Sequence, residues 1–363
     1  MSVDGKAGAQ LLRSWIDAAA ERHPDKPYIV CVEDGRTLTY AELRCASRQI
    51  GEALAGAGIG RNERIALLSG NSIEHLICYL GVMSHGATVC TIHVEMNRQY
   101  LAQILRALHP RLTLFEPELD LADVLSASDA PKIPLTNAFS DELARHSGAR
   151  ASFESDPRDD ACILFTSGTS DRPKGVLLSY RELLSNVEPL AEGIGLTADD
   201  RIYDFRSFNW CSAQVLSALA PLSRGATLLL GRKFSRTRFF QHVTEHRATI
   251  TAGNPTTLAM LLSEDAQPRK ALSALRFIIS SSAPLLPEDW RRFEQRFGIP
   301  VAQSYGCSEI GWIAANPGTG RQFGTVGKPL PYHRLVIVNG GLGNLHALAL
   351  HSFGPTRAVT RRV

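Results

Sequence analysis

The chain has 363 residues, of which 44% are hydrophobic and 21% are charged, and its formal net charge is +3. This length suits one large α/β unit or two ordinary domains, and the apolar content excludes an intrinsically disordered chain. The small charge bias gives no indication of a nucleic-acid partner or of binding to an acidic membrane surface.

The cysteines and the most apolar segment indicate the compartment. The seven cysteines are odd in number and contain no CxxC pair, so we expect neither a disulfide framework nor a zinc site. The most apolar segment, residues 73–94, is interrupted by Glu74, His75 and His85, which a bilayer core tolerates badly. We therefore predict a cytoplasmic protein without a membrane span.

The first third of the chain alternates short apolar runs with helical patterns. Asp34-Gly35 between two strand-like runs predicts a hairpin over residues 28–40. Thr39 and Glu42 have the spacing of a capping box, so a helix is expected to follow them. The other elements expected here are strands at 64–69, 87–92 and 112–115 and helices at 71–84 and 97–108. Continuous apolar strands between amphipathic helices are typical of a mostly parallel sheet covered on both faces.

The pattern weakens over residues 116–158, which we interpret as a connecting stretch, and then resumes. The later strands are expected at 163–165, 226–230, 249–252, 275–280 and 300–303, with a helix at 288–297. The basic run at 232–238 is interpreted as the solvated start of a helix. After Asn339 the α/β pattern stops, and residues 339–363 are expected to form an atypical, basic, loop-like tail.

The most informative segment is residues 163–176, where a buried strand leads into the polar sequence TSGTSDRPKG. Four hydroxyls, a glycine and Lys174 fall within nine positions, and this composition suits an anionic polyphosphate. The segment is not a Walker A loop, because Gly175 rather than Ser or Thr follows Lys174. A polar hairpin turn between two strands is the structural alternative, but a proline directly before Lys174 favours the functional interpretation.

A second polar segment, VAQSYGCSEI at residues 301–310, also follows an expected strand. Open α/β sheets bind ligands at the carboxyl ends of their strands. Tyr305 could stack on a base, Gly306 permits close approach, Ser308 could contact a phosphate and Glu309 could hold Mg²⁺. Taken alone, however, a Tyr-Gly turn and a single glutamate are usually structural.

Taken together and in this order, these segments resemble the motifs of the AMP-forming acyl-CoA synthetase superfamily, which includes peptide-synthetase adenylation domains and luciferases. The family's TSGTTGxPKG stands here as TSGTSDRPKG, and its YGxTE stands as YGCSE. Its GGAPL is similar to SSSAPL at 280–285, and GTVGKPLP at 324–331 matches a further stretch. The resemblance covers roughly residues 10–338. Asp171 departs from the family's glycine and places a negative charge in the phosphate loop.

The resemblance implies an α/β fold. Residues 10–338 are expected to form the adenylate-forming large domain, built as two mostly parallel, layered sheet-and-helix subdomains. The β-barrel and the C-terminal lid that follow in the family are largely missing from this sequence. We therefore expect residues 339–363 to reflect a frameshift, an internal deletion or a truncation, which puts turnover in question.

The resemblance also implies the chemistry. A carboxylic acid attacks the α-phosphorus of ATP, pyrophosphate leaves, and the thiol of coenzyme A then displaces AMP, with Mg²⁺ as cofactor. Catalysis of this kind needs positioning and charge neutralisation rather than a covalent protein nucleophile. Two alternatives stay open: a catalytically incomplete remnant that binds nucleotide, and an adenylation domain that loads a carrier protein. The sequence does not identify the acid.

Site residues follow from the resemblance position by position. Catalytic roles fall to Thr166, Lys174 and Glu309, and Glu309 is the implied Mg²⁺ ligand. The residues implied to bind the nucleotide are Thr166, Ser167, Gly168, Thr169, Ser170, Lys174, Ser282, Ala283, Pro284, Gln303, Ser304, Tyr305, Gly306, Cys307 and Ser308. Among them, the phosphate loop would hold the β- and γ-phosphates, residues 282–284 and Tyr305 the adenine, and Ser308 the α-phosphate.

The acid pocket is less well defined by the sequence. Asn209 stands where the family has a histidine near that pocket. The residues expected to line it are Phe208, Asn209, Trp210, Gln214 and Gly311. Plain core packing is an equal alternative for the aromatic members of this set.

Overall fold

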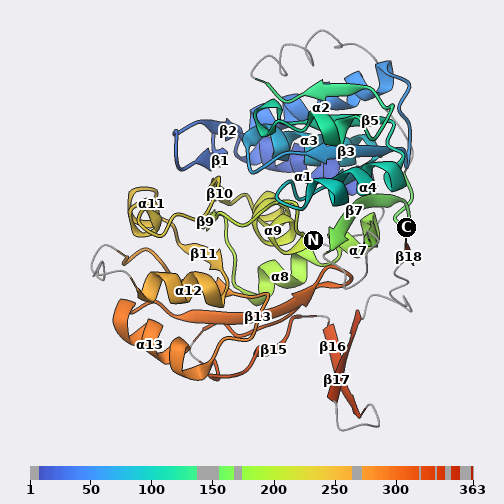
Figure 1. Cartoon of the computed structure of the whole chain (residues 1–363). Coiled ribbons are helices and arrows are strands. Elements are labelled where there is room, and N and C mark those ends of the chain that lie inside the picture. Colours follow the sequence, from blue (N-terminus) through green and yellow to red (C-terminus); the bar gives the residue numbers. More distant parts are fainter. Residues whose placement is uncertain are drawn as a thin grey trace.

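The computed structural model describes residues 8–136, 155–166, 174–263, 272–318, 320–331, 333–339, 345–351 and 361–362. Within these residues the chain forms a seven-stranded sheet, a nine-stranded sheet and a separate two-stranded ribbon (Figure 1). No helix among the described residues is both long enough and apolar enough to cross a bilayer.

The seven-stranded sheet has the order β18-β8-β7-β4-β3-β5-β6. Its strands are β3 (Arg64–Leu68), β4 (Thr88–Thr91), β5 (Leu112–Phe115), β6 (Lys132–Pro134), β7 (Asp160–Thr166), β8 (Lys174–Ser179) and β18 (Arg361–Arg362). The strands from β7 to β6 in this order are parallel, whereas β8 is antiparallel to β7. The start of β8 therefore lies beside the end of β7, with Lys174 opposite Thr166.

The nine-stranded sheet has the order β15-β14-β13-β12-β11-β9-β10-β1-β2. Its strands are β1 (Pro27–Cys31), β2 (Thr37–Thr39), β9 (Arg201–Asp204), β10 (Thr227–Leu230), β11 (Ile250–Gly253), β12 (Phe277–Ser280), β13 (Val301–Cys307), β14 (Gly311–Ala315) and β15 (Lys328–Pro329). The six central strands from β13 to β1 are parallel, and antiparallel strands complete both edges.

Helices cover the sheets and fill the space between them. They are α1 (Ala9–Arg22), α2 (Tyr40–Gly56), α3 (Ile73–His85), α4 (Arg98–Leu108), η1 (Pro117–Leu119), α5 (Ala122–Leu125), α7 (Tyr180–Leu184), α8 (Val187–Gly193), α9 (Cys211–Ala213), η2 (Gln214–Leu219), α10 (Ala220–Arg224), α11 (Phe239–Glu245), α12 (Pro255–Leu262) and α13 (Pro287–Phe297). Their ends follow local chemistry. Thr39 and Glu42 form the capping box of α2, and left-handed Gly86 ends α3.

Alternate residues along the central strands face different cores. In β3, Ile65 and Leu67 belong to the core between the two sheets, whereas Ala66 and Leu68 belong to a core under α4 and α5. In β10, Leu228 faces the shared core and Leu229 faces a third core under α11 to α13. Both sheets are thus buried on both faces, as their continuous apolar sequences require.

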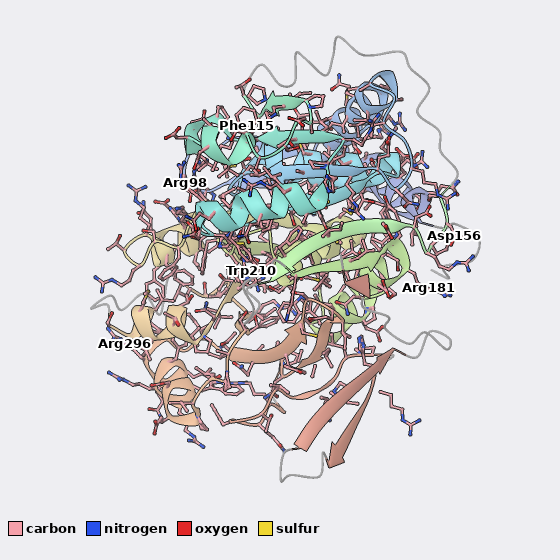
Figure 2. The ribbon with its side chains drawn as sticks, turned by 45° about the vertical axis from the view of Figure 1, so that its right-hand side comes forward. Arg98, Phe115, Asp156, Arg181, Trp210 and Arg296 are labelled. Atoms are coloured by element: carbon pink, nitrogen blue, oxygen red, sulfur yellow. The ribbon has the colours of Figure 1, made fainter. Side chains whose placement is uncertain are left out.

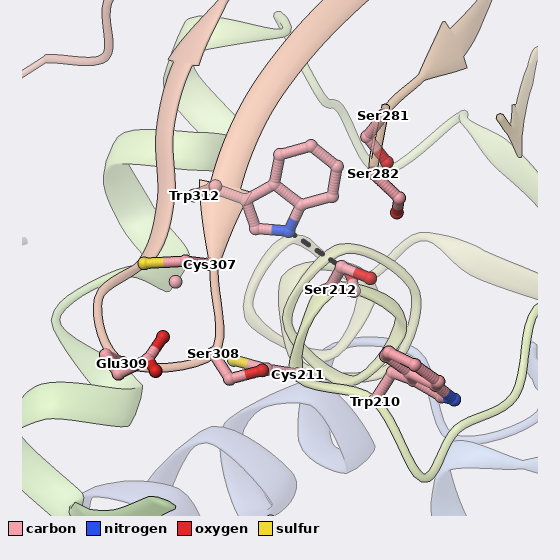
Figure 3. A pocket seen from close by; sticks show the side chains of 11 residues that line it. Trp210, Cys211, Ser212, Ser281, Ser282, Cys307, Ser308, Glu309 and Trp312 are labelled. Carbon is pink, nitrogen blue, oxygen red and sulfur yellow. Dashed lines mark hydrogen bonds between the residues drawn. The ribbon is translucent and has the colours of Figure 1, made fainter. Parts of the chain in front are cut away.

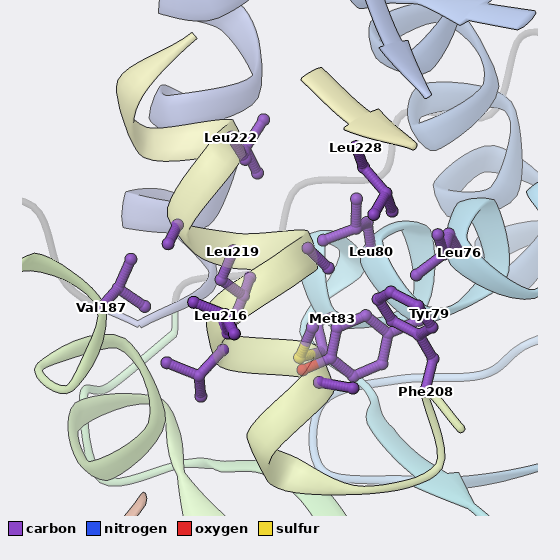
Figure 4. Close-up of a cluster of buried hydrophobic side chains, with 14 of the residues drawn as sticks. Leu76, Tyr79, Leu80, Met83, Val187, Phe208, Leu216, Leu219, Leu222 and Leu228 are labelled. Carbon is purple, nitrogen blue, oxygen red and sulfur yellow. The ribbon is translucent and has the colours of Figure 1, made fainter. Parts of the chain in front are cut away.

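The shared core is helical. Side chains of α3, α8, η2 and α10 meet there with β10, and Tyr79 and Phe208 are fully buried within it (Figure 4). Tyr180 at the start of α7 donates its hydroxyl to the Met83 carbonyl at 2.6 Å. The core therefore joins the strand pair β7–β8 and its following helices to the rest of the molecule.

Most of the elements expected from the sequence are confirmed. The hairpin β1–β2, the capping box, α3, α4, the strands β3 to β5 and the helix α13 lie where the pattern predicted them. The mixed α/β fold with two mostly parallel sheets is also confirmed. The prediction missed β6 inside the connecting stretch, and it missed β9 and β14.

Two expectations are wrong. The tail was expected to be loop-like, but β17 (Leu345–His351) pairs antiparallel with β16 (His333–Asn339). The basic run at 232–238 does not start a helix, because α11 begins at Phe239. Arg232 and Lys233 instead form ion pairs with Glu116 and Glu95, which follow strands of the other sheet.

Candidate active site

The YGCSE motif forms the end of β13 and the turn into β14. Cys307 and Gly311 are paired across this hairpin, so Ser308 and Glu309 lie in the turn. A Cβ atom at Gly306 would lie 2.4 Å from the Gly311 carbonyl oxygen, so only glycine fits there. The glycine of the motif is therefore explained by the tight hairpin that presents the exposed carboxylate of Glu309.

A cavity of about 280 Å³ opens beside this turn (Figure 3). Three segments wall it: the start of α9, the residues after β12, and the β13–β14 hairpin. The lining residues are Trp210, Cys211, Ser212, Ser281, Ser282, Gly306, Cys307, Ser308, Glu309, Gly311 and Trp312. The SSSAPL and YGCSE motifs, which are separated in sequence by α13, thus meet at one cavity.

Strand ends explain why these motifs meet. Strands β12 and β13 are parallel neighbours, so the residues that follow them emerge at the same edge of the sheet. Gln303 on β13 reinforces the pairing, because its Nε2 donates to the Ala283 carbonyl at 2.9 Å. Figure 2 shows Trp210, which comes from the loop after β9, in the middle of the molecule.

The segment after β12 has two features of a binding wall. Ser282 has a φ of 72°, a left-handed conformation that favours glycine and costs free energy for serine. The hydroxyl of Ser281 is buried and has no hydrogen-bond partner among the described residues. Strain and unpaired buried polar groups tend to collect at functional sites, and a ligand can satisfy such a group.

Trp312 fixes the relative position of two walls. Its indole Nε1 donates to the Ser212 carbonyl at 3.1 Å, which joins β14 to α9 (Figure 3). The Arg206 guanidinium lies 6.0 Å from the Trp312 ring centroid and pairs with fully buried Asp204 at 2.7 Å. The indole of Trp312 is thus held rigidly, whereas Trp210 is 42% exposed.

The phosphate-loop motif lies at the ends of β7 and β8. Thr166 is the last residue of β7 and pairs with Lys174, the exposed first residue of β8. Ser167, Gly168, Thr169 and Ser170 lie outside the described residues, as does the side chain of Thr166. The structure therefore places the two ends of the loop.

The structure distributes the nucleotide residues unequally. Ser282, Gly306, Cys307, Ser308 and Glu309 line the cavity. The other residues expected to bind the nucleotide in the SSSAPL and YGCSE segments do not line this cavity. Ala283, Pro284 and Tyr305 are exposed, and Gln303 and Ser304 are buried. The hydroxyl of Ser304 donates to the Ala302 carbonyl at 3.2 Å.

Only part of the expected acid pocket lines this cavity, namely Trp210 and Gly311. Phe208 is fully buried in the shared core. The Nε2 of Gln214 donates to the Thr91 hydroxyl at 3.0 Å and to the Phe208 carbonyl at 2.8 Å.

Asn209 belongs to a second cavity. Its Nδ2 donates to the Ser69 carbonyl at 3.0 Å, and the residue lines a space of about 380 Å³ that also touches His93 and Lys233.

Sequence reasoning missed four lining residues: Cys211, Ser212, Ser281 and Trp312. Cys211 and Ser212 directly follow Trp210, and Ser281 lies inside the SSSAPL motif, so chain proximity was an available signal. The signal for Trp312 was weaker, because its strand β14 was not expected from the sequence.

The thiols at the cavity are poor nucleophiles. Burial raises the pKa of Cys211 to about 12, and nearby Cys307 and Glu309 add to the effect. Burial, followed by the charge of Glu309, also raises the pKa of Cys307. Because the reactive form of cysteine is the thiolate, both residues act as cavity wall at neutral pH. All seven cysteines are free thiols.

The residues at the turn fit Mg²⁺ that arrives with phosphate. Glu309 is the one carboxylate among the described residues that line the cavity. The described residues contain no cluster of three or more histidine, cysteine or acidic side chains that could hold a metal alone. Mg²⁺ is commonly held by one or two carboxylates together with water and substrate phosphates, so this donor set suits it.

Comparison with known proteins agrees with the motifs. Residues 16–347 match the family model described as AMP-binding enzyme. A sulfoacetate–CoA ligase from Cupriavidus necator is 30% identical over 335 residues, which cover 88% of this chain and 64% of that protein. An indoleacetate–CoA ligase from Aromatoleum aromaticum is 31% identical over 342 residues, covering 90% of this chain and 66% of the relative.

A solved structure supports the fold. The anthranilate CoA ligase AuaEII in complex with anthranoyl-AMP superposes with a TM-score of 0.83 at 20% identity, covering 91% of this chain and 65% of that one. This chain thus spans just under two thirds of the length of each of these three proteins.

Proposed function

The chain belongs to the AMP-binding enzyme family, and from this premise we propose that it activates a carboxylic acid with ATP and passes the acyl group to coenzyme A. The observation that carries the proposal is the meeting of two motifs at one cavity, which Ser308 and Glu309 of the hairpin line together with Ser281 and Ser282. Hydroxyls and one carboxylate at the carboxyl ends of parallel strands suit a nucleotide carried with Mg²⁺.

The proposed roles of the residues are electrostatic and positional. Lys174 at the start of β8 neutralises charge on the β- and γ-phosphates, and Ser308 donates to the α-phosphate. Glu309 would hold Mg²⁺, which when bound neutralises phosphate charge and favours departure of pyrophosphate. The two substrates react with each other, so the protonated thiols of Cys211 and Cys307 need no chemical role.

The cavity walls favour an acid with an aromatic group. Trp210 and Trp312 contribute two indole surfaces to the cavity that Ser308 and Glu309 also line. Aromatic walls favour flat or apolar groups through packing of their faces and edges. We propose an aromatic acid, in keeping with the indoleacetate named for one relative.

Carboxylate-dependent exchange between pyrophosphate and ATP tests the proposal. The full chain is incubated with ATP, Mg²⁺, labelled pyrophosphate and a panel of aryl and short-chain acids. We expect exchange that depends on the acid and falls by about 100-fold in Lys174→Ala, because a phosphate-binding charge is lost. Lys132→Ala is the matched control, since Lys132 is also the exposed first residue of a strand, β6, which lies at an edge of the same sheet far from β8.

The outcomes separate the alternatives. ATP binding without exchange for any acid would favour a nucleotide-binding protein that does not complete the reaction. Exchange followed by transfer to a phosphopantetheine carrier, but not to coenzyme A, would favour an adenylation domain. Equal exchange in Lys174→Ala and Lys132→Ala would contradict the assignment of the phosphate loop.

Glu309→Gln gives a second test by direct binding. We expect affinity for ATP in the presence of Mg²⁺ to fall by about 10-fold or more, because the amide is a poorer ligand for a hard cation. The melting temperature should change little, because the Glu309 side chain is exposed. Glu118→Gln, an exposed glutamate on η1, should leave the affinity as it is.

A further inference from the structure

One buried amide joins the hairpin that carries Glu309 to the segment that follows the phosphate loop. Asn186 lies directly before α8 and is 1% exposed. Its Nδ2 donates to the Trp312 carbonyl at 2.8 Å and to the Ile310 carbonyl at 3.4 Å. Its Oδ1 accepts from the Trp312 backbone N–H at 2.8 Å. The amide nitrogen and the amide oxygen of this one side chain therefore both form hydrogen bonds with the backbone just after the turn.

Gly311 allows this contact. Its φ is 81°, and a Cβ atom there would lie 2.5 Å from the Oδ1 of Asn186. The amide thus packs directly against the hairpin backbone at Gly311, where there is no room for a side chain. Because Gly311 also pairs with Cys307, the turn that contains Ser308 and Glu309 is fixed at its base.

The other end of the link leads back to the first motif. Strand β8 begins at Lys174, and α7 follows it with Ser179 and Glu182 as its capping box. Asn186 comes next, after a helix whose Tyr180 is anchored in the shared core. One short, capped segment therefore runs from Lys174 to the amide that holds the hairpin.

The same link reaches a second wall of the cavity. Trp312, whose backbone is clamped by Asn186, donates its indole N–H to the Ser212 carbonyl at the start of α9. Loss of the amide would leave a buried N–H and a buried carbonyl of Trp312 without this partner. An unpaired buried polar group destabilises the folded chain, so the hairpin would shift to recover hydrogen bonds.

We propose that Asn186 is a positioning residue that sets where Ser308 and Glu309 stand relative to the strand that begins at Lys174. It acts through the Trp312 backbone and does not touch the nucleotide. This inference rests on the proposed function. Because Glu309 is the carboxylate that the amide positions, Asn186 should affect the Mg²⁺-dependent part of the affinity for ATP.

Asn316 provides a matched control on the same strand region. It is also buried, and its Nδ2 donates to the Gln322 carbonyl at 2.8 Å while its Oδ1 accepts from the Gln322 N–H at 3.2 Å. It clamps the loop after β14 and is not among the residues that line the cavity. Asn316→Ala therefore removes similar buried hydrogen bonds without disturbing the Glu309 turn.

Calorimetric titration of the full chain with ATP, in Mg²⁺ and separately in EDTA, tests the inference. In Asn186→Ala we expect affinity in Mg²⁺ to fall by about 10-fold and affinity in EDTA to change by less than about twofold. Asn316→Ala should keep the wild-type ratio between the two conditions, even where its melting temperature falls as much. Asn186→Ser, which keeps a small polar group but is too short to hold both the N–H and the carbonyl of Trp312, should show a loss in the same direction and serves where the alanine variant does not fold.

Two results would overturn the inference. One is an unchanged Mg²⁺ dependence in the Asn186 variants, and the other is an equal loss in Asn316→Ala. Absence of ATP binding by the wild-type chain would overturn the proposed function itself, and this inference with it.

Discussion

The shared core and the cavity wall lie in contact but are built on different rules. In the core, Leu76, Leu80, Leu216 and Leu219 pack with no exposed surface, and each could be exchanged for another apolar residue of similar volume (Figure 4). In the cavity wall, Ser282 has a left-handed backbone, and Glu309 is exposed on a tight turn. The core supplies stability, whereas the wall holds individual groups in place at some cost in stability.

The largest difference between the two regions should be seen when a core residue is replaced and stability and ATP affinity are both measured. Leu80→Ala removes a fully buried side chain from α3 and should lower the free energy of unfolding by about 3 kcal/mol. The affinity for ATP of the folded fraction should stay unchanged. Urea titration and calorimetry measure the two quantities. A loss of stability below about 1 kcal/mol, or a change in affinity, would show that the regions are not separate.

The core also contains a buried histidine that should make stability depend on pH. Burial lowers the pKa of His75 to about 4, against a smaller opposing effect of the Phe208 backbone, and its Nδ1 lies 2.7 Å from the Ser69 hydroxyl. The unfolded chain binds this proton at about pH 6.5, so the unfolded state holds more protons between pH 4 and 6.5. Stability is thus fully present above pH 6.5 and falls as the pH drops toward 4, by up to about 3 kcal/mol.

Chemical denaturation at several pH values measures this slope, and His75→Gln should flatten it. If the slope between pH 6.5 and 4 is the same in His75→Gln, the titrating group is not His75.

The smallest effect should come from the strained wall. Ser282→Gly should raise the free energy of unfolding by up to about 1 kcal/mol, because glycine adopts a positive φ without the steric cost. Ser263→Gly is the control, since exposed Ser263 has an ordinary φ of −84°, and it should lower stability by about 0.5–1 kcal/mol. A loss of stability in Ser282→Gly equal to that in Ser263→Gly would show that the wall carries no backbone strain.

The core was easier to predict from the sequence than the wall. Strands such as Ile65 to Leu68 are continuous apolar runs, and the pair Thr39 and Glu42 is local chemistry, so both could be found without the fold. The strand β9 was missed because its sequence RIYD is short and half polar. The strand β14 was missed because its sequence GWIAA is short, begins with glycine and directly follows the turn of the YGCSE motif.

The wall depends on contacts between distant segments. The motifs predicted that Ser308 and Glu309 share a strand end, and the structure brings them to a cavity with Ser282 and Trp210. No local pattern indicates that Asn186 reaches the Trp312 backbone, because that contact requires the two sheets to be in place. Residues that position other residues are therefore the part of the site that could not be predicted from the sequence.

The central claim is that the phosphate-loop strands and the β13–β14 hairpin act on one nucleotide. Hydrogen exchange followed by mass spectrometry on the full chain, during titration with ATP and Mg²⁺, tests it most directly. We predict that peptides spanning residues 160–179 and 301–315 gain protection together, with the same half-saturating ATP concentration, while residues 122–134 stay unchanged. Protection of only one of the two segments, or of each at a different ATP concentration, would contradict the claim.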